Sequence, residues 1–302
     1  MSDRPSQQIS FIPARVPEEV IAEAREGENV LVSYCLFSGG NDSTVVAHRC
    51  KDHYEALVHI DTGTAVPGVR DFCEEFAAWL GKPLIVYTTP PDEYRRIVMG
   101  SDKLRKGGKP DLAMGFPGPA MHGTCYTRLK ERQVEALVRE TKRAHPDNDR
   151  YARVLLLTGL RRAESARRKG RAEITRKGAQ IWCNPLIDWT ARDMWDYRDL
   201  HMQDAPMSDV AALLHRTGEC NCGAYAAPGE REELQAIYPE WFNTTIAVLE
   251  QEARDAGLSS CVWGGKPGRP EEHQDEFMCS DCQLKIEDPP LALAEASDTV
   301  DG

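Results

Sequence analysis

Short apolar runs alternate with helix-forming stretches along roughly the first two-thirds of this 302-residue chain. Apolar runs of about four to eight residues bounded by turn residues are typical of buried strands. Their alternation with helices favours an α/β fold, a Rossmann-like parallel sheet covered by helices on both faces. The expected strands are Val30–Phe37, Ala56–Ile60, Leu84–Tyr87, Arg153–Thr158 and Gln180–Cys183. The expected helices are Glu18–Glu26, Ser43–Cys50, Pro67–Leu80, Thr127–Arg143 and Ala191–Leu200.

The alternation stops near residue 205, where cysteines, prolines and two further helical runs follow, Glu230–Ile237 and Trp241–Ala256. We expect a small cysteine-containing C-terminal lobe there, with too few apolar residues to dock by hydrophobic burial alone. The expected divisions are an N-terminal arm and helix (1–26), the α/β domain (27–204), the lobe (205–286) and an acidic, disordered tail (287–302).

The charge and hydropathy of the sequence argue against several classes of protein. The net charge of -11 argues against a protein that coats nucleic acid, although residues 160–177 are locally basic. No apolar run approaches the roughly 20 residues of a membrane helix, and the first residues lack the apolar segment of a signal peptide. We therefore expect a cytoplasmic protein with no membrane partner. Ten cysteines in that compartment indicate metal, cluster or thiol chemistry rather than disulfides.

The first expected strand ends in the sequence SGGNDS, residues 38–43. Adjacent glycines let the backbone turn with its N–H groups pointing inward, which forms an anion-binding nest. Asn41, Asp42 or Ser43 can cap the following helix, whose N-terminus favours phosphate. Polar residues also follow two other strands, at 61–63 and 158–162. Because α/β sheets bind ligands at the carboxyl ends of their strands, we expect these three segments to form one site.

The chain resembles a known family through these segments. SGGNDS matches the PP-loop of the ATP pyrophosphatase superfamily, and four further segments resemble phosphoadenosine phosphosulfate (PAPS) reductases. These segments are HIDTGTAVPGVRDFCEEF, GTCYTRLKERQVEAL, LTGLRRAESARR and NPLIDWTARDMWDY. They occur in the order found in that family, and the resemblance covers roughly residues 30–222.

The resemblance implies roles for individual residues. It implies that Ser38, Gly39, Gly40, Asp42 and Ser43 hold the phosphates of an adenine nucleotide, that Asp61 and Gly63 flank it, and that Lys130, Arg161 and Arg162 neutralise phosphate or sulfate. Arginine is suited to this role because its guanidinium group binds multi-oxygen anions with two parallel hydrogen bonds. The implied nucleotide is ATP or PAPS, with Mg²⁺ as a candidate companion ion.

One family motif is missing. PAPS reductases attack sulfur with a cysteine in a C-terminal Glu-Cys-Gly-x-His motif, and the nearest thiols here, Cys279 and Cys282, lack its Gly and His. This favours adenylation of an acceptor by ATP followed by sulfur or other group transfer, over sulfonucleotide reduction. That chemistry resembles the DNA phosphorothioation sulfurtransferases of the superfamily. A nucleic acid or nucleobase is then a candidate acceptor, and a thiol or cysteine desulfurase a candidate sulfur donor. The alternative is a non-catalytic nucleotide-sensing or nucleic-acid-binding module.

The remaining cysteines offer a metal site. Cys220, Cys222, Cys279 and Cys282 form a CxC and a CxxC pair. Four thiolates suit Zn²⁺ or a [4Fe–4S] cluster, and the spacing does not decide between them. A competing arrangement, which the family suggests, joins Cys125 to Cys220 and Cys222. Cys125 is also a candidate catalytic, sulfur-carrying thiol.

Overall fold

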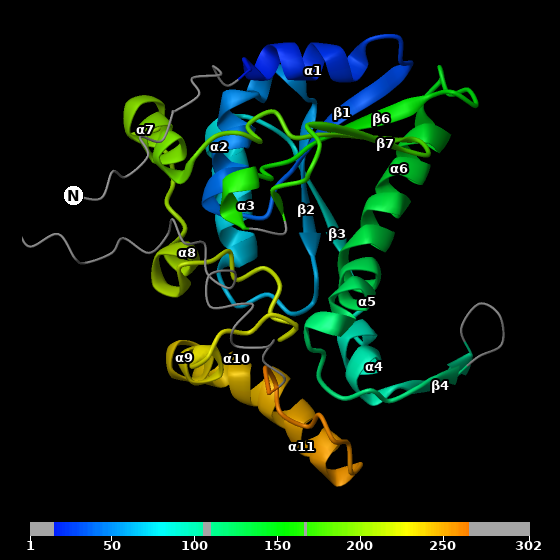
Figure 1. Ribbon diagram of the computed structural model, residues 1–302, viewed down its shortest axis with the longest axis vertical. Helices are drawn as coiled ribbons and strands as arrows, with labels where there is room; N and C mark the ends of the chain where they lie inside the picture. Colours follow the sequence, from blue (N-terminus) through cyan, green and yellow to red (C-terminus); the bar gives the residue numbers. More distant parts are fainter. Residues whose placement is uncertain (1–14, 105–109, 166–167, 266–302) are drawn as a thin grey trace, which may run out of the picture.

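A six-stranded sheet forms the centre of the protein (Figure 1). The computed structural model describes residues 15–104, 110–165 and 168–265. The strand order is β3-β2-β1-β6-β8-β7, and all neighbours are parallel except β7 and β8. The strands are β1 Val30–Leu36, β2 Ala56–Asp61, β3 Leu84–Thr88, β6 Arg153–Leu157, β7 Ile174–Lys177 and β8 Gln180–Cys183. A separate antiparallel pair consists of β4 Ser101–Leu104 and β5 Pro110–Asp111.

The α/β fold and all five expected strands are confirmed, and β7 was missed. In β7 only Ile174 is partly buried, whereas the other three residues are exposed. An edge strand of this kind lacks the apolar pattern by which a strand is predicted. Its turn with β8 contains Gly178, whose φ of 58° lies in the left-handed region that favours glycine.

Helices occupy the connections and the C-terminal part of the chain. They are α1 Pro17–Arg25, α2 Asn41–Arg49, α3 Val69–Leu80, α4 Glu93–Met99, α5 His122–Tyr126, α6 Arg132–Ala144, α7 Ala191–His201, α8 Asp209–Leu214, α9 Glu230–Ile237, α10 Pro239–Trp241 and α11 Val248–Asp255. Short 3₁₀ turns are η1 Lys51–His53, η2 Pro119–Met121 and η4 Arg162–Glu164. π-helical turns, η3 Thr127–Glu131 and η6 Phe242–Ala247, join α5 to α6 and α10 to α11. Within the described ranges, no helix has the length and apolar character needed to span a bilayer.

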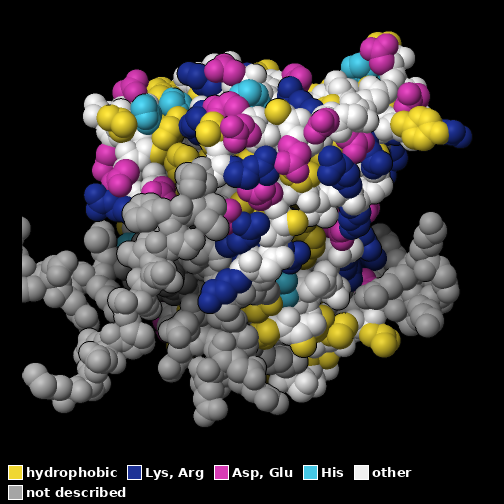
Figure 2. Space-filling view, turned by 45° about the horizontal axis from the view of Figure 1, so that its top comes forward, with side chains coloured by type: hydrophobic (Ala, Val, Ile, Leu, Met, Phe, Trp, Pro, Cys, Tyr) yellow, Lys and Arg dark blue, Asp and Glu magenta, His cyan; other side chains and the backbone are white. Residues whose placement is uncertain are grey.

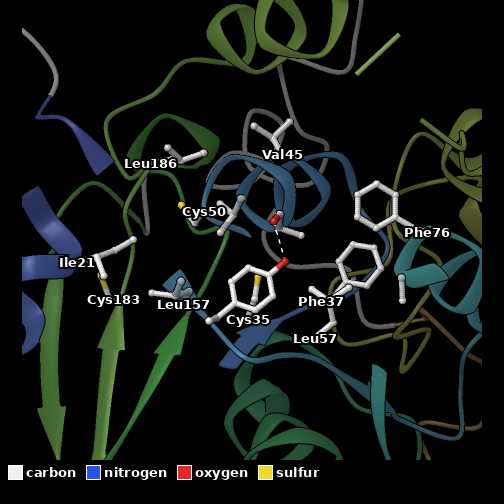
Figure 3. Packing of buried hydrophobic residues seen from close by; sticks show 14 of the residues in the cluster. Ile21, Cys35, Phe37, Val45, Cys50, Leu57, Phe76, Leu157, Cys183 and Leu186 are labelled. Atoms are coloured by element: carbon white, nitrogen blue, oxygen red, sulfur yellow. Dashed lines mark hydrogen bonds between the residues drawn. The ribbon is translucent and has the colours of Figure 1, made fainter. Parts of the chain in front are cut away.

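Both faces of the sheet are buried, which explains the nearly continuous apolar strands. On one face, Cys35 and Leu157 pack with residues of α1, α2 and α3, among them Ile21, Val45 and Phe76 (Figure 3). On the other face, side chains of alternate strand residues pack against α6. These residues are Tyr34, Ala56, Val58, Ile60, Val154 and Leu156 from the strands, with Val134, Leu137 and Val138 from α6.

A second core lies below the sheet in Figure 1 and joins α4 and α5 to the C-terminal helices. Phe242, Ile246 and Trp263 are almost fully buried in it, together with Tyr94 and Cys125. The expectation that the C-terminal lobe cannot dock by hydrophobic burial is therefore wrong. The predicted division at residues 204 and 205 stays a prediction, and residues 287–302 lie outside the described part of the chain.

A buried carboxylate of α11, that of Glu250, connects this helix to α9 and to Trp263 near the end of the described residues. Glu250 is fully buried and accepts two hydrogen bonds from Arg231, at 2.8 and 2.7 Å, and one from the Trp263 amide at 3.0 Å. Burial alone would raise the Glu250 pKa, but the Arg231 and Trp263 hydrogen bonds outweigh burial and lower the pKa below the ordinary value.

We expect the Glu250 ion pair to make stability depend on acid pH. A lowered folded-state pKa adds stability above the unfolded pKa, and this stability is lost as the pH falls through the folded pKa. The free energy of unfolding of Glu250→Gln should therefore lie below that of the wild type at neutral pH and approach it below about pH 4, by chemical denaturation. A difference that stays constant down to pH 3 would contradict this.

Candidate functional site

The SGGNDS turn lies between β1 and α2. Gly39 has a φ of 78°, and Gly40 is the N-cap of α2. The expectation that Asn41, Asp42 or Ser43 caps the helix is wrong, because no side chain caps this end. Instead, the hydroxyls of Ser43 and Thr44 donate to the Gly40 carbonyl at 2.9 and 2.8 Å. A helix N-terminus without a side-chain cap presents amides that suit an anion.

The loop after β6 packs directly on this turn. A Cβ added at Gly159 would lie 2.8 Å from both the Asp42 carbonyl carbon and the Ser43 nitrogen, so only glycine fits there. Next to it, Arg161 is 1% exposed and donates from Nε to Asp42 Oδ2 at 2.7 Å. Two of the three predicted loop segments are thus in contact. In this state the Arg161 guanidinium pairs with Asp42.

The third segment follows β2. Gly63 donates its amide to Asp61 Oδ1 at 2.9 Å, and a Cβ at Gly63 would meet open space. Both residues line an open pocket of about 390 Å³. The other lining residues are His59, Ala65, Val66, Pro67, Gly68, Arg70, Asp71 and Trp241.

A segment from the C-terminal part, Thr217–Cys222, lies across these loops. Its Thr217 methyl group would be 2.3 Å from a Cβ added at Gly40. The carbonyl of Glu219 accepts a hydrogen bond from the Thr62 hydroxyl at 2.6 Å. Asn221 is bound to both the carbonyl and the hydroxyl of Thr64, at 2.9 and 3.1 Å. The segment is therefore fixed to the loops after β1 and β2.

Lys130 reaches the same segment from η3. Its Nζ donates to the buried carboxylate of Glu219 at 2.7 Å. Burial alone would lower the Lys130 pKa, but the charge of Glu219 and its hydrogen bond with Lys130 outweigh burial and raise the pKa above its ordinary value. Lys130 is therefore cationic throughout the neutral range.

Three thiols meet beside Lys130. Cys222 interacts with both Cys125, at the start of the α5–η3–α6 helical run, and Cys220. The hydrogen bond with Cys125, followed by burial, raises the Cys222 pKa to about 12. The contact with Cys222, followed by burial, also raises the Cys220 pKa. Without a bound cation, Cys220 and Cys222 are protonated at neutral pH and are poor nucleophiles.

The predicted residues thus fall into several groups. One group lies at the junction of the β1 and β6 loops: Ser38, Gly39, Gly40, Asp42, Ser43 and Arg161. In a second group, Lys130 and Cys220 lie beside Glu219, Cys222 interacts with Cys220, and Cys125 with Cys222. Arg162 lies apart from Lys130 and forms an ion pair with Asp188. Cys279 and Cys282 are outside the described residues. Among those that are described, no group of three or more His, Cys, Asp or Glu side chains is placed to hold a metal ion.

The sequence reasoning missed Thr217, Glu219 and the close approach of Gly159. Glu219 directly precedes the CxC pair, and an acidic residue next to two thiols was a usable signal. Its partner Lys130 is 89 residues away in the sequence. Such a pairing follows from the tertiary fold and has no local pattern.

We expect Gly40→Ala to abolish nucleotide binding, and Thr217 provides a control for the reason. The new Cβ would clash with the Thr217 methyl group as well as with a bound phosphate. The double variant Gly40→Ala/Thr217→Ser removes the methyl group. If the phosphate is the main obstacle, calorimetric ATP affinity stays lost in the double variant. Restored affinity would show that the clash with Thr217 alone was responsible.

A comparison with protein families agrees with the residue pattern. The family model described as phosphoadenosine phosphosulfate reductase domain matches residues 33–209. No curated protein sequence matches the chain. Among solved structures, a phosphoadenylyl-sulfate reductase from Candida auris in a phosphate complex has 18% identity, with 66% of this chain and 85% of that one covered and a TM-score of 0.43. The U34-tRNA thiolase NcsA from Methanococcus maripaludis with its [4Fe-4S] cluster has 14% identity, with 80% and 76% covered and a TM-score of 0.38.

Proposed function

The chain belongs to the phosphoadenosine phosphosulfate reductase domain family, and we propose that it is an adenine-nucleotide-dependent sulfur- or group-transfer enzyme. One observation carries the proposal. The segment Thr217–Cys222 contacts the phosphate-binding turn at one end, through Thr217 and Gly40, and supplies two of the three clustered thiols at the other. A nucleotide held at the turn therefore lies next to sulfur chemistry.

The proposed reaction has two steps. An acceptor oxygen attacks the α-phosphorus of ATP and releases pyrophosphate, which leaves an adenylated acceptor. A sulfur nucleophile then replaces that oxygen and releases AMP. Sulfide does this with no change of oxidation state, whereas a persulfide from a cysteine desulfurase first forms a mixed disulfide with the acceptor, whose S–S bond a thiol donor must then reduce. In this scheme the amides of residues 39–43 hold the phosphates, and Mg²⁺ is a candidate companion ion. Lys130 stabilises the negative charge that develops on the phosphates.

Sulfonucleotide reduction is the second candidate. It is favoured because Cys222 contacts two other thiols, those of Cys125 and Cys220. One thiolate would attack the sulfonyl sulfur of PAPS and release adenosine 3′,5′-bisphosphate. A second thiolate would then release sulfite and form a disulfide, which a dithiol reductant must restore. The raised pKa values of Cys220 and Cys222 disfavour the thiolate that the first step requires.

The products distinguish these reactions. Anaerobically purified protein is incubated with ATP or with PAPS, with candidate acceptors and donors present. Pyrophosphate and AMP formed from ATP would support the first scheme, and sulfite formed from PAPS would support the second. Nucleotide binding with no turnover of either would contradict both and favour a non-catalytic module.

Lys130 offers a test of the site itself. Lys130→Met should slow turnover by about ten- to a hundredfold, since a charge-assisted hydrogen bond contributes roughly 1.5–3 kcal/mol. Lys130→Met leaves the Glu219 carboxylate buried without its partner, which can also destabilise the fold. The double variant Lys130→Met/Glu219→Gln removes this buried charge, so a loss of turnover that persists in it comes from the missing lysine and not from a folding defect. Lys51→Met, at an exposed lysine of η1, is the matched control. Equal rates for Lys130→Met and Lys51→Met would remove Lys130 from the mechanism.

The three thiols are soft sulfur donors, the kind of ligand that a thiophilic metal or cluster prefers, although as placed they do not form a group of three that could hold a metal ion. We propose Cys125, Cys220 and Cys222 as ligands, with Cys279 and Cys282 as the candidates that complete the set. Bound Zn²⁺ or a [4Fe–4S] cluster would supply a Lewis-acidic centre that holds sulfur. Metal and sulfide analysis should show that Cys222→Ser loses the bound metal while Cys50→Ser, a buried thiol of the other core, retains it.

A further inference from the structure

Three aromatic rings lie beside the thiols. His122 and Tyr126 are four residues apart on α5, and their ring centroids are 6.4 Å apart. Tyr225, three residues after Cys222, places its ring 4.7 Å from that of His122. Tyr126 is 39% exposed, although its neighbour Cys125 is buried. We call His122, Tyr126 and Tyr225 the aromatic shelf.

Several cations lie near the aromatic shelf in a chain that is acidic as a whole, although Lys130 is paired with Glu219 and Lys177 with Glu131. Residues 160–177 contain eight Lys or Arg and two Glu, against a net charge of -11 for the protein. Burial and the charge of Glu131 raise the pKa of the Tyr126 hydroxyl. Lys130, Lys177 and Arg171 are close enough to act against this rise. Figure 2 shows Lys and Arg side chains spread over the middle of one face of the protein.

The aromatic shelf and the phosphate-binding turn lie at opposite ends of one segment. Thr217 contacts the turn at Gly40, Cys220 and Cys222 follow, and Tyr225 joins the aromatic shelf. The thiols therefore lie between a site for a nucleotide and a surface of stacking rings. A transferred group would pass from the first to the second.

We propose that the aromatic shelf binds an unpaired base of a single-stranded nucleic acid, and that this base is the acceptor of the transferred group. This rests on the proposed function. Aromatic side chains stack on any base, and nearby Lys and Arg bind the backbone phosphates. A strand fits better than a free nucleotide because the cations extend from Lys130 on η3 to Arg171, in the loop before β7, and Lys177 on β7.

The test measures binding of a short fluorescent single-stranded RNA, with DNA of the same sequence and a mononucleotide as separate arms. Tyr126→Ala should weaken RNA or DNA binding by about 5- to 150-fold, as expected for the loss of one base–aromatic stack. Tyr126→Phe keeps the ring and should bind as the wild type does. Tyr151→Ala removes a more exposed tyrosine, near the C-terminal end of α6, and serves as the matched control.

Arg171→Ala is a second variant, which does not depend on the folding of Tyr126→Ala. It should weaken binding and reduce the slope of log affinity against log salt by about one. Unchanged binding by both Tyr126→Ala and Arg171→Ala would overturn the proposal. A loss of ATP affinity in Tyr126→Ala would also overturn it, because the rings would then hold adenine. If ATP still yields pyrophosphate but neither strand binds, the acceptor proposal fails and the proposed function stands.

Discussion

Replacing Arg128 by methionine is expected to lower the free energy of unfolding by about 3–5 kcal/mol, because it breaks a buried ion network. The Arg128 side chain is 6% exposed and donates to Glu93 at 2.6 Å and to Asp111 at 3.0 Å. Both carboxylates are also buried. Burial alone would lower the Arg128 pKa, but these carboxylates outweigh it and raise the pKa. Removal of the guanidinium would leave two negative charges in the interior.

Arg132→Met is the matched control for this prediction. Arg132 contacts the same Glu93 oxygen at 3.0 Å, but its side chain is 55% exposed. Exposed ion pairs contribute about 0–1 kcal/mol, so chemical denaturation should show a small loss. If the two variants lose equal stability, Arg96, which contacts both Glu93 and Asp111, compensates for Arg128 and the prediction is wrong.

The helical run that contains Arg128 shows what the sequence could and could not predict. The helical spacing of residues 127–143 predicted one helix, and the structure has a continuous helical run that begins earlier, at His122, and contains a π turn. A π turn is rare and often occurs at functional sites, but it has no simple sequence pattern. Lys130 belongs to this turn, and its position was implied only by the family resemblance.

The central strands were predictable because each is buried on both faces, so local hydropathy alone identifies them. The turn after β1 was predictable because an apolar strand ends there at a glycine pair, and Gly39 has a φ of 78°, which favours glycine. Its role in phosphate binding stays a prediction. The Thr217–Cys222 segment was not predictable, since its contacts with Gly40, Thr64 and Lys130 join residues far apart in the sequence. A single sequence contains no record of such pairings.

Gly159→Ala is expected to weaken ATP binding by about 5- to 150-fold without unfolding the protein. The added Cβ would lie 2.8 Å from backbone atoms of Asp42 and Ser43, and a backbone cannot rotate away as a side chain does. Overpacking typically costs about 1–3 kcal/mol. If the β1–α2 turn moves to relieve the contact, this cost appears as lost affinity, at about 1.4 kcal/mol for each factor of ten.

Gly170→Ala makes the same chemical change where a Cβ meets nothing within 4 Å, so it should leave the calorimetric ATP affinity unchanged. The difference between the two variants therefore reports the contact between the β6 loop and the turn. The general effect of replacing a loop glycine is common to both. A folded Gly159→Ala protein with wild-type affinity would show that the turn does not hold the nucleotide. The turn is held by Gly159 from one side and by Thr217 from the other. We therefore expect an added atom at either contact to displace the amides of the turn and to weaken phosphate binding.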